Sequence, residues 1–134
     1  MRWMLDTDTC IYVMKHQPPQ VRKRLRRVAI GEVGISAIVF AELELGVAKS
    51  KHRQDNAAAL ADFLCYCIVL DWPQEAAATY ADIRSTLEAQ RRPIGGNDLL
   101  IAAHALHLGS TLVTNNTAEF ERVAGLVLEN WRAP

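Results

Sequence analysis

The stretch Trp3-Met4-Leu5-Asp6-Thr7-Asp8-Thr9 opens the chain with three apolar residues followed by a polar, acidic segment. The apolar run has the length of a short buried strand, and Asp8 or Thr9 can cap a helix that continues to about Lys15. Asp6 is the first polar residue after this strand, so we expect it at the carboxyl edge of the sheet, where open α/β sheets bind ligands. The simpler interpretation is that Asp6 or Asp8 only caps the helix. One aspartate would be enough for that role, and the sequence has two.

The rest of the chain alternates between short apolar runs and longer helical patterns. Further strands are expected at residues 33–36, 67–70, 111–113 and about 126–128. Helices are expected at about residues 19–29, 37–51, 55–66, 73–90 and 97–108. Such alternation is typical of the α/β class, with a mostly parallel sheet covered by helices. The length of 134 residues predicts a single domain over residues 1–134.

The composition restricts the classes of protein that fit. Half of the residues are hydrophobic, which excludes a wholly disordered chain. Lys and Arg together equal Asp and Glu at 15 each, so no broadly basic surface for nucleic acid is expected and local charge must be judged separately. Cys10, Cys65 and Cys67 fit neither a disulfide framework nor a zinc site. Without a signal peptide or a run of about 18 apolar residues, we expect a cytoplasmic protein with no membrane partner.

Two glutamates lie within an apolar helical segment and compete for one role. Around Glu42, the helical neighbours are Ile38, Val39, Leu45 and Gly46, so its carboxylate is expected to be buried and to need a partner or a metal. Glu44 has a similar setting, with Phe40, Ala41, Val47 and Ala48 as neighbours. Periodicity does not choose between the two, and either could instead reach solvent.

Asp98 begins a helical segment that is apolar on nearly every face, which predicts a buried helix. An acid in a first helical turn is also favoured by the helix dipole alone, but Asn97 already offers a cap. The preceding Gly95-Gly96 would allow a close approach of backbone or substrate.

Polar residues also follow the strand expected at 111–113. Asn116 and Glu119 could add oxygen ligands or hold a water molecule there, although a plain turn explains them equally well. Carboxylates without cysteine or paired histidine suit hard cations such as Mg²⁺ or Mn²⁺. The reaction that fits such a site is phosphodiester hydrolysis by a metal-bound water. The four histidines are scattered, and His104 and His107 are expected to be packing or helix-surface residues.

Four segments together resemble the motifs of PIN domains, in the order of that family and over essentially the whole chain. They are Met4-Leu5-Asp6-Thr7-Asp8, then Ser36-Ala37 with Ala41-Glu42-Leu43-Glu44-Leu45-Gly46, then residues 95–105 beginning Gly95-Gly96-Asn97-Asp98, and finally Val113-Thr114-Asn115-Asn116-Thr117-Ala118-Glu119-Phe120. The resemblance implies a PIN-like three-layer α/β/α sandwich with a short central sheet. It also implies that Asp6, Glu42 and Asp98 are the conserved acids, which selects Glu42 over Glu44.

Within that family the chain is most similar to the VapC group, the toxins of type II toxin–antitoxin pairs. This implies an endoribonuclease that uses Mg²⁺ or Mn²⁺ on structured RNA such as tRNA. It also implies a homodimer that joins a larger assembly and is inhibited by a VapB antitoxin. One residue departs from the pattern, because many PIN domains carry a fourth aspartate where Asn116 stands. Glu119, Asn116 itself or a water could fill that role, and a catalytically silent RNA-binding or assembly module is the alternative function.

Basic residues fall into three clusters that could contact RNA or simply face solvent. They are residues 22–27, Arg91-Arg92, and Lys49 with Lys51 and Arg53. Arg91-Arg92 precedes the Gly95-Gly96 loop and is therefore expected nearest to the acidic residues. An apolar groove for an antitoxin helix is expected near the early helices, from Ile11, Tyr12, Val39, Phe40 and Leu43.

Overall fold

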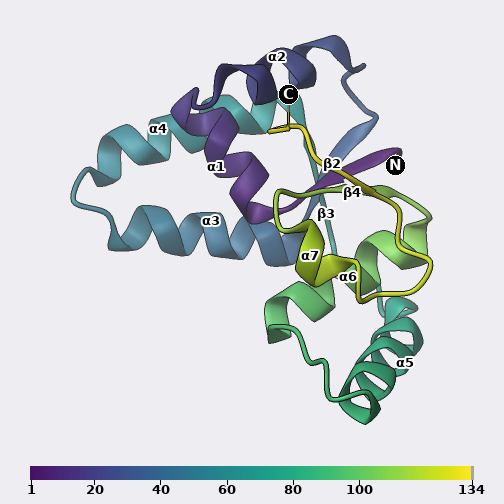
Figure 1. Ribbon diagram of the computed structural model, residues 1–134. Coiled ribbons are helices and arrows are strands. Elements are labelled where there is room, and N and C mark those ends of the chain that lie inside the picture. Colours follow the sequence, from purple (N-terminus) through teal and green to yellow (C-terminus); the bar gives the residue numbers. More distant parts are fainter. Residues whose placement is uncertain (134) are drawn as a thin grey trace.

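A five-stranded parallel sheet lies at the centre of the computed structural model, which describes residues 1–133 (Figure 1). Its strands are β1 (Trp3–Leu5), β2 (Val33–Ser36), β3 (Ile68–Leu70), β4 (Thr111–Val113) and β5 (Leu128–Glu129). They lie in the order β3-β2-β1-β4-β5, and every neighbouring pair is parallel. In the centre, β1 aligns Trp3 with both Val33 and Thr111. The prediction of a short, mostly parallel sheet is confirmed.

Helices cover both faces of this sheet. They are α1 (Thr7–Lys15), α2 (Pro19–Arg27), α3 (Ala37–Lys49), α4 (Arg53–Phe63), the 3₁₀ turn η1 (Leu64–Tyr66), α5 (Ala76–Ala89), α6 (Gly96–Leu108) and the short α7 (Thr117–Phe120). The strand order runs outward from β1 to β3, then returns past β1 to β4 and β5. Because parallel crossovers are right-handed, this reversal places α1–α4 on one face and α5 and α6 on the other (Figure 1). The predicted three-layer α/β/α sandwich is confirmed.

Several predicted helix ends are wrong for identifiable reasons. Asp6, not Asp8 or Thr9, is the N-cap of α1. Asn97 does not cap α6. This helix begins one residue earlier, at Gly96, directly after Gly95, and no side chain caps it. Residues 73–75 form turns that precede α5, so Pro73 does not open that helix. The predicted cap of α3 is confirmed, because the Ile38 amide donates to Ser36 Oγ over 3.2 Å.

The three cysteines differ in burial. Cys10 and Cys67 are buried free thiols and Cys65 is an exposed one. Within residues 1–133, every helix is too short or too polar to cross a membrane.

His104 on α6 is part of the core, with only 1% of its surface exposed. Its Nδ1 lies 2.9 Å from Ser36 Oγ, so the ring joins α6 to the end of β2. Burial lowers the pKa of His104 from its ordinary value of 6.5, and the charge of His107 lowers it further. His107 itself is exposed. The predicted packing role of His104 is thus confirmed, and His107 is a surface residue.

The depressed pKa of His104 predicts a pH-dependent stability. Below pH 6.5 the unfolded chain binds a proton that the folded chain resists, so the free energy of unfolding should fall as the pH drops below that value. Urea unfolding at pH 7.5, 6 and 5 would measure this. A His104→Gln variant is the control, and its free energy of unfolding should fall less steeply over this range. Identical pH dependence in both proteins would exclude His104 as the source.

Candidate active site

Four acidic side chains line one cavity of about 200 Å³, namely the three acids selected from the sequence and Asp8 on α1. Asp6 follows β1, Glu42 lies in the middle of α3, and Asp98 lies in the first turn of α6. The cavity lies at the carboxyl end of β1, next to β4, where the strand order reverses. Open α/β sheets bind ligands at such switch points. The three acids selected from the sequence are therefore neighbours in the fold.

Asp6 is buried, with 5% of its surface exposed, and is held by its neighbours. Its Oδ1 accepts a hydrogen bond from the Thr9 amide over 2.9 Å. Burial raises its pKa, and hydrogen bonds from Thr114 and Thr9 partly offset that increase. Thr9 Oγ1 also donates to the Val113 carbonyl over 3.1 Å, which ties α1 to β4. The capping role considered for Asp6 is real, but Asp6 also lines the acidic cavity.

Glu42 and Glu44 have different surroundings although they are two residues apart on α3. Glu42 is half-buried, lines the cavity and accepts a hydrogen bond at Oε1 from Thr7 Oγ1 over 2.7 Å. Glu44 is exposed and does not line the cavity. The ambiguity left by helical periodicity is thus removed by the orientation of α3, which turns Glu42 toward Asp6 and Asp98.

Asp98 also faces the carboxylate of Glu119, which does not line the cavity. The pKa of Asp98 is raised to about 7, first by burial and then by the charge of Glu119 and a hydrogen bond between the two. The charges of Glu42 and Asp6 raise it further. A hydrogen bond between two carboxyl groups needs one proton. With a pKa of about 7, Asp98 is present in both its protonated and its ionised form near neutral pH. The charges of the neighbouring acids therefore disfavour the ionised form of Asp98.

Glu119 and Asn116 are joined to each other and to the loop before α6. Glu119 Oε1 accepts from the Gly95 amide over 3.1 Å, and Asn116 Nδ2 donates to Glu119 Oε2. The backbone amide of Asn116 donates to Thr114 Oγ1 over 2.9 Å. Asn116 lines the acidic cavity, whereas Glu119 lies behind Asp98. Both residues therefore belong to an ordered hydrogen-bonded network rather than to a plain turn.

The available ligand atoms suit a hard divalent cation. Carboxylate, amide and hydroxyl oxygens line the cavity, and no cationic side chain is among its described lining residues. A divalent ion would offset the mutual repulsion that raises the pKa of Asp98. Within residues 1–133, however, no three acids already converge as closely as metal ligands do. Glu42 is engaged with Thr7 and Asp98 with Glu119, so these side chains would have to rotate to share an ion.

Three threonines of the site were not assigned a role there from the sequence. Thr7 positions Glu42, while Thr9 and Thr114 hold Asp6. Their signal was present, because Thr7 and Thr9 flank Asp8 after β1 and Thr114 is the first residue after β4. Hydroxyl groups at the ends of neighbouring parallel strands are expected to meet.

Comparison with known proteins places this arrangement in a family. Residues 3–126 match the PIN domain family. The chain is 42% identical to the ribonuclease VapC2 of Rickettsia felis and 41% identical to a tRNA(fMet)-specific endonuclease VapC of Shigella flexneri, in each case over 98% of both chains.

Solved structures agree with the sequence comparisons. A chain of a DNA-bound VapBC from Salmonella typhimurium matches with a TM-score of 0.91 and 37% identity over 98% of both chains. A chain of VapBC2 from Rickettsia felis, bound to a promoter DNA fragment, matches with a TM-score of 0.89 and 38% identity over 98% of this protein and 99% of that chain. The protein is therefore a member of the PIN-domain family and, within it, of the VapC ribonucleases.

Proposed function

We propose that this chain is the toxin of a type II toxin–antitoxin pair and cuts structured RNA with a divalent ion held by Asp6, Glu42 and Asp98. The single observation that carries the proposal is the convergence of these three acids, from β1, α3 and α6, on one cavity. Mg²⁺ is the proposed ion, with Mn²⁺ able to replace it. Residues 1–134 would form one PIN domain acting in the cytoplasm. Transfer RNA is the proposed substrate, because the Shigella flexneri relative is a tRNA(fMet)-specific endonuclease.

The chain's own groups would bind and orient the reactants. When bound, a divalent ion supplies a nucleophilic water near neutral pH and offsets charge on the phosphodiester. Thr9 and Thr114 fix Asp6, which limits the freedom of this ligand, whereas Glu42 would turn away from Thr7 to reach the ion. To bind the ion, Asp98 would give up its hydrogen bond with Glu119. Glu119, still held by the Gly95 amide, would then be able to accept a proton. Asn116 is the proposed source of a further neutral oxygen ligand.

A groove next to the acidic cavity supports the proposed VapB-type antitoxin. It lies between α1, α3 and α4, has a volume of about 290 Å³, and is lined by apolar residues that include Ile11, Met14, Leu43 and Val47. Glu42 lines both this groove and the acidic cavity, so a partner in the groove would reach the site directly. Of the residues expected from the sequence, Ile11 and Leu43 line the groove, whereas Tyr12, Val39 and Phe40 do not. The toxin would act as a homodimer within the larger assembly.

Purified protein and a transfer RNA provide the test. Cleavage is expected with Mg²⁺ or Mn²⁺, and EDTA should stop it because the acids cannot replace a cation. Adding the protein encoded by the neighbouring reading frame should inhibit cleavage if that protein is the antitoxin. Cleavage that continues at full rate in EDTA would exclude the proposed mechanism. Metal-dependent binding of RNA without cleavage would instead support a catalytically silent module.

A further inference from the structure

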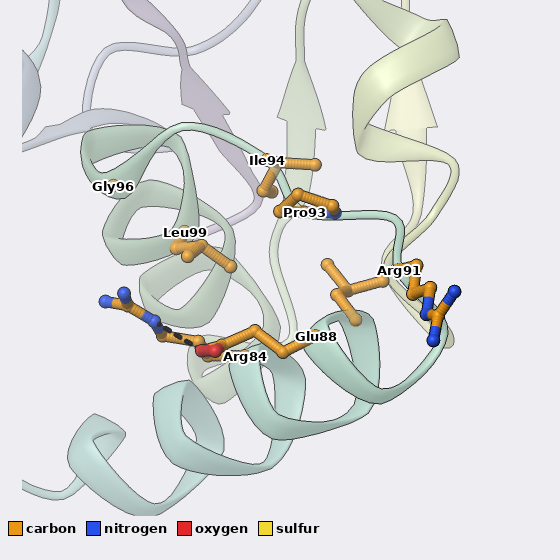
Figure 2. Close-up of a pocket in the computed structure, with 8 residues that line it drawn as sticks. Arg84, Glu88, Arg91, Pro93, Ile94, Gly96 and Leu99 are labelled. Carbon is orange, nitrogen blue, oxygen red and sulfur yellow. Dashed lines mark hydrogen bonds and ion pairs between the residues drawn. The ribbon is translucent and has the colours of Figure 1, made fainter.

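A second, larger cavity lies on the other side of the loop that borders the acidic site. It has a volume of about 510 Å³ and lies between the end of α5 and the start of α6, where Pro93, Ile94 and Gly96 form part of its wall (Figure 2). The residue between them, Gly95, contacts the acidic side. Its amide donates to Glu119, and a Cβ at this position would lie 3.6 Å from Asp98 Oδ2. Residues 93–96 therefore connect the second cavity to Glu119 and Asp98 of the acidic site.

The lining of this second cavity, here called the arginine pocket, differs in charge from the acidic site. Arg84 and Arg91 lie on opposite sides of the apolar residues Ile94 and Leu99 (Figure 2). Leu87 also lines the pocket. Glu88 is the only acid that lines the pocket among the described residues. A cationic pocket therefore adjoins a cavity lined by four carboxylates, in a chain whose formal net charge is zero.

Arg84 is held by side-chain hydrogen bonds, whereas Arg91 is marked by its backbone conformation. Arg84 Nε donates to Glu88 over 2.9 Å and Nη1 donates to Tyr80 over 2.7 Å, which fixes the guanidinium while leaving Nη2 without a partner within residues 1–133. Arg91 follows the end of α5 in the left-handed region, with a φ of 56°. That conformation is uncommon for residues other than glycine. Position 91 therefore carries an arginine, although a glycine would be less strained there.

The segment of residues 93–96 is itself held by hydrogen bonds from neighbouring side chains. Arg122 Nη1 donates to the Pro93 carbonyl over 2.9 Å, and the Gly95 amide is held by Glu119.

The side chains of several other basic residues already contact groups of the same chain. Arg24 forms an ion pair with Glu129 at 2.8 Å, and Arg22 contacts the Val13 carbonyl and His16. The long basic run on α2 therefore offers fewer free cations than its sequence suggests.

We propose that the arginine pocket binds a nucleotide of the RNA next to the bond that is cut. This inference rests on the proposed ribonuclease function. The base would lie on the apolar residues, and the flanking phosphates would reach Arg84 and Arg91, since single-stranded RNA is held by cationic grooves with surfaces for bases. The pocket has the size of known small-ligand sites. Because the acidic cavity repels phosphate, a cationic contact just outside it keeps the RNA beside the metal ligands.

Equilibrium binding of an RNA hairpin with a single-stranded loop would test this. All proteins would carry Asp6→Asn, which stops cleavage while keeping a side chain that caps helices as well as aspartate does. In Mn²⁺, Arg84→Gln or Arg91→Gly should each weaken binding about tenfold and lower the slope of log affinity against log salt by about one. Arg91→Gly also suits the left-handed backbone, so its stability should not fall.

Arg2→Gln is the matched control, because Arg2 is an exposed arginine directly before β1, at the end of this strand opposite Asp6, and lines neither cavity. It should bind RNA like the unaltered background. Equal losses in all three variants would indicate general charge attraction and overturn the proposal, as would unchanged binding by both pocket variants. A changed mass in sedimentation without a change in RNA affinity would assign the pocket to contact with a second copy, which also overturns it. Cleavage by the chain with Asp6 intact is measured separately and tests the ribonuclease function on its own.

Discussion

Asp98→Asn should reduce metal-dependent RNA cleavage by at least about 100-fold while leaving the fold intact. The reduction follows because a catalytic ion contributes several kcal/mol and each 1.36 kcal/mol corresponds to a tenfold change in rate. Asparagine has the size of aspartate but lacks the negative charge that a divalent ion requires. Cleavage rates and Mn²⁺ affinity by calorimetry would both be measured, and both should fall.

The same substitution should not destabilise the protein. Burial and the charges of Glu119, Glu42 and Asp6 already disfavour the ionised form of Asp98. An amide at this position can donate to Glu119 without a shared proton, so the melting temperature should stay the same or rise. Asp82→Asn, on the exposed face of α5, is the matched control and should change neither cleavage nor metal affinity. Full cleavage by a pure Asp98→Asn protein would exclude the proposed site.

Glu42→Gln and Glu44→Gln form a second test on a single helix. Glu42→Gln should reduce cleavage by at least about 30-fold, because it removes a charged ligand from the cavity. Glu44→Gln should leave cleavage within about twofold of the unaltered rate, because Glu44 is exposed and surface substitutions have small effects. Both changes keep the helix propensity nearly constant, so helix stability does not confuse the comparison.

The comparison of the two glutamates is informative in either direction. Single-turnover cleavage of one transfer RNA by both variants, with circular dichroism to verify folding, gives the required rates. Equal losses would mean that neither glutamate holds the ion and that α3 contributes only structure. A larger loss for Glu44→Gln would assign the role to the wrong face of α3 and would contradict the geometry of the cavity.

The strands were predictable because each is a short apolar run buried in a parallel sheet. The bounds of β1, β2 and β4 match the sequence prediction to the residue. Helix ends were less predictable, because several residues near each end can supply a cap and only the backbone direction selects one. Asp6 rather than Asp8 caps α1 for this reason, and α6 begins behind Gly95 without a side-chain cap.

By itself, the sequence determined the fold class and placed Asp6 at the edge of the sheet, since both depend on local pattern and on strands that end at a common edge. It placed Asp98 at the start of a buried helix, because that segment is apolar on nearly every face. The motifs in family order also selected Glu42. Only the tertiary structure decided which face of α3 meets the cavity, and it joined Glu42 to Thr7 and Asp98 to Glu119. It also set the arginine pocket against the acidic cavity across residues 93–96. These pairings link residues far apart in the chain, and local periodicity carries no information about the rotation of one packed element against another.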